Sequence, residues 1–391
     1  MANRSATIVG VGLSDCPKAP ELDTVQHHVL ALRRALDDAG LQLSDIDGYM
    51  CAGGDFKAVD NAGTMVEYLG LNNNLTFFEG TQVGGSSFEM YVQHAIAAIE
   101  AGQCDVIAMT YGSDLLTASG SNPGFGQRAE GELVEGILQY EIPFGNTLIG
   151  CYAMSAQRHM YEYGTTSEQL AEIAVACRTH AGLNPFAQYR KPITVADVVY
   201  SRMIADPLHM LDCCVISDGG GAIIITTEER AKDLRQPPVH ILGAGTGQTH
   251  WNTNQMPDFT QTAAKSSGET AFRMAGLTPA DVDTVQLYDS FTITALLMLE
   301  DLGFCKKGEG GSFVEGGTLQ LGGKLPLNTD GGALSSCHPG MRGIFLLAEA
   351  ARQIRGQAGD AQVPDCDVAL ACGSGGWLSV ISTVILGKER G

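Results

Sequence analysis

The 391-residue sequence predicts an α/β protein, and three observations support this class. Strand-like apolar runs alternate with amphipathic, helix-like runs along the chain, as they do in layered α/β folds. The length allows two or three domains, or one large duplicated domain, with ample residues for a buried core. Two pairs of segments also recur in the same order early and late in the chain, which indicates that an α/β unit is duplicated.

Each element is predicted from a local signal. Short apolar runs bounded by polar or glycine residues predict strands at residues 6–12, 46–51, 104–110, 220–227, 239–242, from about 285, and at 368–371. Apolar residues at helical spacing, with capping residues or glycine at the ends, predict helices at residues 24–39, 84–102, 168–180, 292–302 and 344–354. Residues from about 113 to 205 are richer in loops and form a predicted insertion.

The repeated segments place a boundary near Gln236-Pro237-Pro238. Residues 39–47 match residues 275–283, and a Cys-Asp-Val strand start at 104–106 matches one at 366–368. In both copies a helix that ends in glycine leads into an apolar strand. We therefore expect an N-terminal half of residues 1–235, which carries the insertion, and a C-terminal half of residues 236–391.

The composition restricts the classes of function. The net charge of −20 disfavours non-specific binding to nucleic acid or to anionic membranes. Eleven scattered cysteines, no signal-peptide pattern and no run of 18 apolar residues favour a cytoplasmic protein with reduced thiols. Glycine is unusually frequent, at 49 residues. Because these glycines follow no collagen period, they must serve turns and close backbone approaches.

The densest group of candidate functional residues is the glycine-rich loop of residues 328–343, which opens the helix at 344–354. Such a loop presents backbone N–H groups and a positive helix end to an anion or a developing oxyanion. His338 at this entrance could donate a hydrogen bond or move a proton, and Gly340 would let a ligand approach the backbone. The alternative is a loop histidine held by backbone hydrogen bonds.

Two more candidates follow predicted strands of the second half. Cys372 comes directly after the strand at 368–371 and before a glycine turn that includes Gly375, so its thiol could lie in a crevice. It could equally be a small buried residue. Tyr288 offers a phenol for acid–base chemistry, and Asp289 could orient it or cap the next helix.

The first-half helix begins with Gly84, Gly85, Ser86 and Ser87. The glycines would let a ligand reach the backbone, and the serine hydroxyls could contact it or only cap the helix. The sequence has no Walker-type phosphate loop, no HExxH zinc motif and no GxSxG nucleophile motif, and we expect no metal site. Residues 243–247 lack the full dinucleotide fingerprint and predict a turn.

Together, the duplicated halves, the His338-Pro339 loop and the turn from Cys372 to Gly376 resemble the thiolase superfamily over nearly the whole chain. The resemblance is to the sterol-carrier-protein-type thiolases and their lipid-transfer-protein-like relatives. It implies a duplicated five-layer α/β/α/β/α fold, a homodimer, acyl-CoA substrates and carbon–carbon bond chemistry, with coenzyme A as part of the substrate and no tightly bound cofactor. By position, His338 resembles the histidine that polarises the thioester oxygen, and Cys372 resembles the cysteine that acts as acid and base.

The sequence departs from thiolases at the nucleophile. The position of the family's reactive cysteine falls on Gly85, and no cysteine lies between Cys51 and Cys104. This pattern resembles the thiolase-like aldolases of steroid side-chain breakdown, which usually work with a small zinc-ribbon/OB-fold partner. A retro-aldol reaction of a β-hydroxyacyl-CoA would then use Tyr288 as base, with His338 and the backbone at Gly84-Gly85 stabilising the enolate.

Two alternatives remain open at this point. The chain could be an acetyltransferase-type thiolase that uses Ser86, Ser87 or another cysteine. It could instead be a CoA- or lipid-binding scaffold subunit of a complex. In each case the phosphates of CoA must be offset within an acidic chain, for which Arg342, Arg190, Lys191 or a basic partner are candidates.

Overall fold

The computed structural model describes residues 4–53, 61–72, 74–119, 138–141, 143 and 147–390. Residues 120–137 of the predicted insertion lie outside the described residues. The strands of the described part are β1 (Ala6–Leu13), β2 (Gly48–Cys51), β3 (Phe77–Glu79), β4 (Val106–Ser113), β5 (Met203–Ala205), β6 (Leu208–His209), β7 (Gly219–Thr227), β8 (Val239–Gln248), β9 (Thr284–Leu287), β10 (Val368–Gly375) and β11 (Val380–Gly387). The helices are α1 (Thr24–Ala39), α2 (Ala62–Leu69), α3 (Ser87–Glu100), α4 (Leu115–Ser119), α5 (Leu138–Glu141), α6 (Leu148–Tyr163), α7 (Ser167–Leu183), α8 (Val195–Val199), α9 (Glu228–Ala231), α10 (Ala264–Ala275), α11 (Thr292–Asp301), α12 (Gly310–Phe313) and α13 (Gly343–Ile354).

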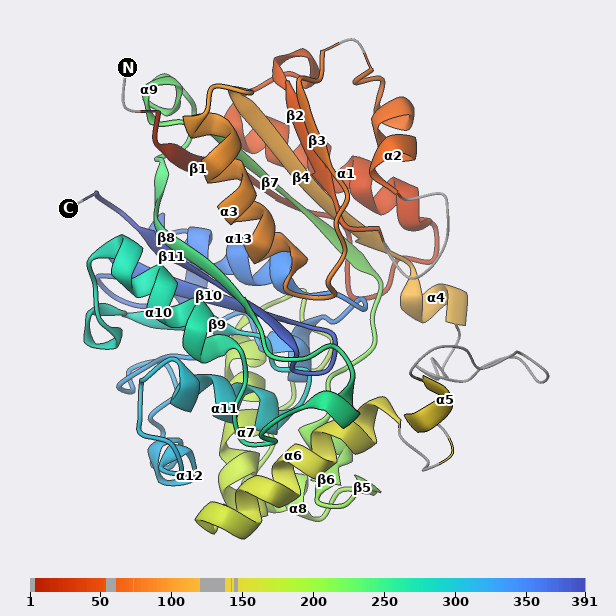
Figure 1. The fold of residues 1–391 in the computed structure, drawn as a ribbon, viewed down its shortest axis with the longest axis vertical. Coiled ribbons are helices and arrows are strands. Elements are labelled where there is room, and N and C mark those ends of the chain that lie inside the picture. Colours follow the sequence, from red (N-terminus) through yellow and green to blue (C-terminus); the bar gives the residue numbers. More distant parts are fainter. Residues whose placement is uncertain are drawn as a thin grey trace.

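The main strands follow the order β3-β2-β4-β7-β1-β8-β11-β10-β9, and chain position divides them into two groups. The first five strands precede residue 228 and the last four follow residue 238. Among the described strands, the two groups pair only through β1 and β8, where Thr7 pairs with His240 and Ile8 with Val239. Helices α3 and α13 contact strands of both groups and each other, α1 packs on β1, β4 and β7, and α10 packs on β8 and β11 (Figure 1). This arrangement is the predicted α/β class, in which helices pack on the strands of both groups.

The two halves repeat the same local structure. Helices α1 and α10 both end at a glycine in the left-handed conformation, Gly40 and Gly276, which only glycine adopts without cost. The chain then enters a short 3-10 turn and a strand that is parallel to its neighbour. Asp47 accepts backbone hydrogen bonds from residues 105 and 106, and Asp283 accepts them from residues 367 and 368. These matching interactions support the division at residues 235 and 236 that we propose.

The structure corrects the turn predicted at residues 243–247, because these residues lie inside β8. A Cβ at Gly243 or Gly245 would collide with the α10 backbone, so the glycines let this helix lie directly on the strand. The predicted loop-rich insertion also holds long helices, α6 and α7, which lie together with α8 and the β5–β6 hairpin at one end of the molecule (Figure 1). Among the described residues, no helix is long and apolar enough to cross a membrane.

Candidate active site

The centre of the candidate site is a hydrogen bond between two buried side chains of the C-terminal half. Tyr288 follows β9, and its hydroxyl lies 2.9 Å from Nε2 of His338, in the loop before α13. The same hydroxyl lies 3.3 Å from the carbonyl oxygen of Gly340. The sequence predicted all three residues as site residues, and the structure brings them together.

Residues of the N-terminal half hold the histidine loop in place. Ser217 Oγ accepts the His338 backbone N–H at 2.8 Å. The Tyr111 hydroxyl donates to the carbonyl of Pro339 and accepts the backbone N–H of Met341 at 3.0 Å. Sequence reasoning missed Tyr111 and Ser217, because their roles depend on contacts between residues more than 100 positions apart.

The buried side chain of Arg342 and its acidic partners hold the same loop in place. The guanidinium of Arg342 is fully buried, donates to both carboxylate oxygens of Asp330 at 2.6 and 2.5 Å and also donates to the carbonyl of Cys337. Asp289 Oδ1 lies 3.9 Å from Arg342 Nε. This removes Arg342 from the candidates for offsetting the CoA phosphates, because its charge is already paired inside the protein. Arg190 and Lys191 stay predictions.

The sequence predicted that Asp289 orients Tyr288 or caps the next helix, and the structure gives it a different role. Its carboxylate accepts the backbone N–H groups of Ala333 at 2.7 Å and Leu334 at 3.1 Å, in the turn that precedes His338. It makes no cap of α11, whose N-cap residue Phe291 has no side-chain hydrogen bond. Asp289 therefore connects the Tyr288 segment to the His338 loop.

Gly85, the position where the thiolase resemblance places a nucleophile, packs against the ring of Tyr288. A Cβ at residue 85 would lie 2.5 Å from Tyr288 Cζ and 2.6 Å from the carbonyl oxygen of Ser374. Real Cβ atoms essentially never come within 3.0 Å of another heavy atom. The space that a cysteine side chain would need is therefore occupied by the tyrosine.

Backbone glycines of three segments converge beside this contact. A Cβ at Gly84 would lie 2.9 Å from the backbone nitrogen of Gly376 and 3.0 Å from Cα of Gly375. Gly84 and Gly340 are partly exposed, whereas Gly85 and Gly375 are buried. The predicted glycines thus lie together where α3 begins, and the rim formed by Gly84, Gly340 and Gly376 is open to solvent.

The two serines at the start of α3 differ in their contacts. Ser87 Oγ donates to the Gly84 carbonyl at 2.7 Å and accepts the Val83 backbone N–H at 3.0 Å, which is a local capping arrangement. Ser86 is fully buried, and its hydroxyl has no hydrogen-bond partner among the described residues. A Cβ at Gly375 would lie 2.6 Å from Ser86 Oγ, so this hydroxyl faces the glycine turn.

The structure does not bring the Cys372 thiol to the Tyr288–His338 pair, which corrects the predicted acid–base role. Its Sγ lies 3.3 Å from Oγ1 of Thr383 on β11, and Thr383 in turn bonds Ser267 of α10 at 2.8 Å. The flanking Gly373 faces Ser86 and Glu89 of α3 instead. Because side chains alternate along a strand, Cys372 points to the α10 face, away from α3.

Burial sets the protonation states of the central pair. Burial and, to a smaller extent, the neighbouring Arg342 charge lower the pKa of His338 to about 3, so the imidazole is neutral at pH 7. Burial raises the pKa of Tyr288 well above its usual value, so the phenol keeps its proton. The pair is therefore a neutral phenol next to a neutral imidazole, and the imidazole can accept a proton only while a negative charge develops beside it. Burial also raises the pKa of the Cys372 thiol.

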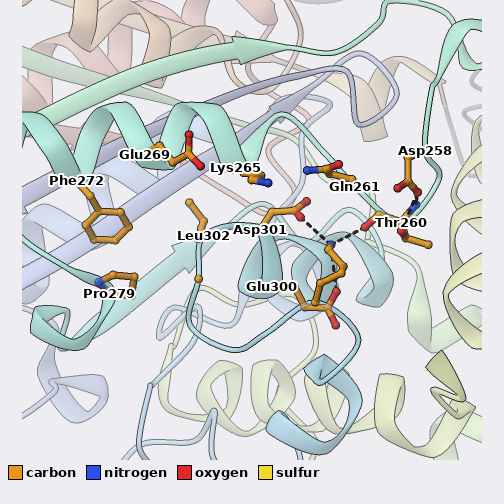
Figure 2. A pocket seen from close by; sticks show the side chains of 12 residues that line it. Asp258, Thr260, Gln261, Lys265, Glu269, Phe272, Pro279, Glu300, Asp301 and Leu302 are labelled. Atoms are coloured by element: carbon orange, nitrogen blue, oxygen red, sulfur yellow. Dashed lines mark hydrogen bonds and ion pairs between the residues drawn. The ribbon is translucent and has the colours of Figure 1, made fainter. Parts of the chain in front are cut away.

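A cavity of about 610 Å³ lies elsewhere, beside α10 and α11 (Figure 2). The ammonium group of Lys307 in this cavity is paired with Asp301 at 2.7 Å and Glu300 at 3.2 Å. Asp258 and Glu269 also line it. This acidic, internally paired lining does not suit the phosphates of CoA. The described residues include no group of three or more His, Cys, Asp or Glu that could hold a metal ion.

Comparisons with known proteins agree with this fold. The family of thiolase C-terminal domain-like sequences matches residues 245–388. A steroid side-chain-cleaving aldolase of Thermomonospora curvata is 35% identical over 99% of this chain and 98% of its own. An acetyl-CoA acetyltransferase of Methanothermobacter thermautotrophicus is 34% identical over 88% of each chain.

Among solved structures, an Ltp2-ChsH2(DUF35) aldolase superimposes with a TM-score of 0.87 and is 34% identical, covering 99% of this chain and 98% of that chain. The agreement extends over both halves, so the layered fold described above is the thiolase fold. The chain therefore belongs to the thiolase superfamily, in the branch that includes sterol-carrier-protein-2-like thiolases and side-chain-cleaving aldolases.

Proposed function

We propose that this protein is an acyl-CoA carbon–carbon lyase that cleaves a β-hydroxyacyl-CoA by a retro-aldol reaction, without an acyl-enzyme intermediate. The observation that carries this proposal is the contact between Gly85 and the Tyr288 ring, which occupies the place of a nucleophilic side chain. The similarity to a steroid side-chain-cleaving aldolase supports the same reaction class. The similarity to an acetyl-CoA acetyltransferase supports a CoA thioester as substrate.

The Tyr288–His338 pair supplies the acid–base chemistry in this proposal. Tyr288 takes the proton of the substrate's β-hydroxyl while it passes its own proton to Nε2 of the neutral His338. The bond between Cα and Cβ then breaks. The β-carbon leaves as a ketone or aldehyde, and the electron pair moves into the thioester as an enolate. Return of the proton to Cα gives the shorter acyl-CoA, so no acyl acceptor is required.

The enolate oxygen needs hydrogen-bond donors or positive charge. Helices α3 and α13 both begin beside the pair, the first just after Gly85 and the second just after Arg342. A helix N-terminus presents free N–H groups and a partial positive charge of about half an elementary unit. Two such ends at one place suit an oxyanion that develops during the reaction.

The test is turnover of a panel of β-hydroxyacyl-CoA thioesters, including steroid side-chain analogues, with separate detection of the carbonyl product and of the shortened acyl-CoA. We expect equal amounts of both products, and loss of turnover in Tyr288→Phe. The proposal fails if active-site variants and wild type release acyl-CoA equally, or if free CoA must be added for the carbon–carbon bond to break.

We further propose that the working assembly contains more than this chain. The Ltp2-ChsH2(DUF35) aldolase pairs two named components, which supports a small zinc-ribbon/OB-fold partner that contributes positive charge toward CoA. A homodimer is supported by the edge strand β3, where Phe78 is 63% exposed at the end of the sheet order. Sedimentation of the protein alone tests the homodimer, and sedimentation with the partner tests the complex. Phe78→Lys should weaken the dimer.

A further inference from the structure

Two cysteines that are distant in sequence lie against each other directly behind the histidine loop. Cys16 follows β1, and Cys337 immediately precedes His338. The two thiols lie close enough that each shifts the pKa of the other. The Cβ of Cys16 and the Sγ of Cys337 lie 3.2 and 3.3 Å from the point where a Cβ of Gly219 would stand. The absence of a side chain at residue 219 therefore lets them approach each other.

The Cys337 thiol is coupled to the position of His338 through one hydroxyl. Ser217 Oγ lies 3.1 Å from Cys337 Sγ and accepts the backbone N–H of His338 at 2.8 Å. The carbonyl of Cys337 accepts a hydrogen bond from Arg342. A covalent change at Cys337 Sγ would therefore act on the backbone that carries His338.

The two thiols are unequal in a way that suits thiol oxidation. The neighbouring Cys337 lowers the pKa of Cys16, against the opposing effects of burial and of the Asp330 charge. Burial instead raises the pKa of Cys337, as it does for the half-buried Cys305. Cys16 is half-buried and Cys337 is buried. Cys16 is thus the thiol that an oxidant reaches first, and Cys337 is placed to react with it.

We propose that Cys16 and Cys337 form a reversible intramolecular disulfide that switches the site off under peroxide. In the first step the Cys16 thiolate attacks one oxygen of hydrogen peroxide, the O–O bond breaks, and hydroxide leaves and becomes water on protonation. In the second step the sulfur of Cys337 attacks the sulfenic acid of Cys16, an S–S bond forms, and a second water leaves with the thiol proton. Two electrons pass from the thiols to the peroxide, and a dithiol reverses the change.

The disulfide would separate His338 from Tyr288. An S–S bond of about 2.05 Å draws Cys337 Sγ toward Cys16 and away from Ser217. Because Ser217 holds the backbone of His338, the loop shifts and the hydrogen bond between His338 and Tyr288 is lost. This consequence for activity rests on the proposed function, whereas formation of the disulfide does not.

The experiment treats the full-length protein with a small excess of hydrogen peroxide at pH 7 and maps peptides without reduction. We expect a cross-linked peptide pair containing residues 16 and 337, which disappears with dithiothreitol. A mapping that finds Cys16 as sulfonic acid without any cross-link to Cys337 would overturn the proposal, whatever the protein's activity.

Activity is measured on the same samples. We expect at least a tenfold loss on oxidation in wild type and in the control Cys305→Ser, with recovery after dithiothreitol. Cys16→Ser should keep its basal rate and resist the loss. If the cross-link forms and the rate stays unchanged, the disulfide is not a switch. If Cys16→Ser loses activity to peroxide as fast as wild type, another group is the target.

Discussion

Replacing Gly85 with alanine adds a single methyl group at the contact on which the proposed reaction depends. The new Cβ would stand 2.5 Å from Tyr288 Cζ and 2.6 Å from the Ser374 carbonyl oxygen. The strand carbonyl cannot move cheaply but the tyrosine ring can, and because its Cε2 would stand 2.1 Å from the new Cβ, the ring must shift by about 1 Å. Such overpacking costs about 1–3 kcal/mol of stability.

The same displacement should affect the reaction more than the fold. The Tyr288 hydroxyl is 2.9 Å from His338, and a shift of about 1 Å in a reacting group can cost roughly 100-fold in rate. We therefore expect the lyase rate of Gly85→Ala to fall by about 100-fold. The assay is product release at saturating substrate, together with urea unfolding of the same samples.

A matched control is Gly182→Ala in α7, where the added Cβ would lie 3.4 Å from the carbonyl oxygen of Arg190, an ordinary contact. This variant should keep the wild-type rate. The double variant Gly85→Ala/Tyr288→Ala should lose much less stability than the two single variants lose together. The reason is that the ring that the methyl group displaces is already gone. Wild-type rate and stability in Gly85→Ala would refute the reasoning.

Three further outcomes are expected. Tyr288→Phe should lower kcat by about 10²–10⁴-fold while the protein stays folded by circular dichroism, since the phenol acts in proton transfer; a loss confined to KM would contradict this role. Cys372→Ser should change kcat less than threefold, because the thiol points to Thr383; a loss of more than 100-fold would restore its acid–base role. Glu89→Gln should change how stability depends on pH. Burial raises the pKa of Glu89 to about 8, so the wild-type protein loses stability as the pH rises from about 4.5 to 8, by up to about 5 kcal/mol. Urea unfolding of Glu89→Gln at several pH values in this range should show that the loss of stability with rising pH is gone. If the loss is as large as in the wild type, other groups cause it.

Local sequence signals predicted most elements well. The helix at residues 24–39 has the same bounds in the structure, because Asp23 forms a capping box at its start and Gly40 ends it in a left-handed turn. The loop at His338 was predicted from its glycines and the following amphipathic helix. Such signals come from neighbouring residues, so one sequence is sufficient to read them.

Features that depend on distant residues could not be predicted in this way. The direction of the Cys372 side chain follows from strand register, and a shift of one residue reverses the face. The burial of Arg342 depends on Asp289 and Asp330 lying on both sides of it in space. The glycines at 243 and 245 looked like a turn because α10, which needs their missing side chains, comes later in the chain.

The proposed reaction proceeds without a covalent intermediate, and intact-protein mass spectrometry during turnover detects such an intermediate directly if it forms. The protein is mixed with a β-hydroxyacyl-CoA, quenched in acid within the first turnovers, and its mass is compared with that of the untreated chain. We expect stoichiometric carbonyl and acyl-CoA products with no acylated protein. An acyl adduct that forms and decays at the rate of turnover, mapped to Ser86 or Ser87, would contradict it.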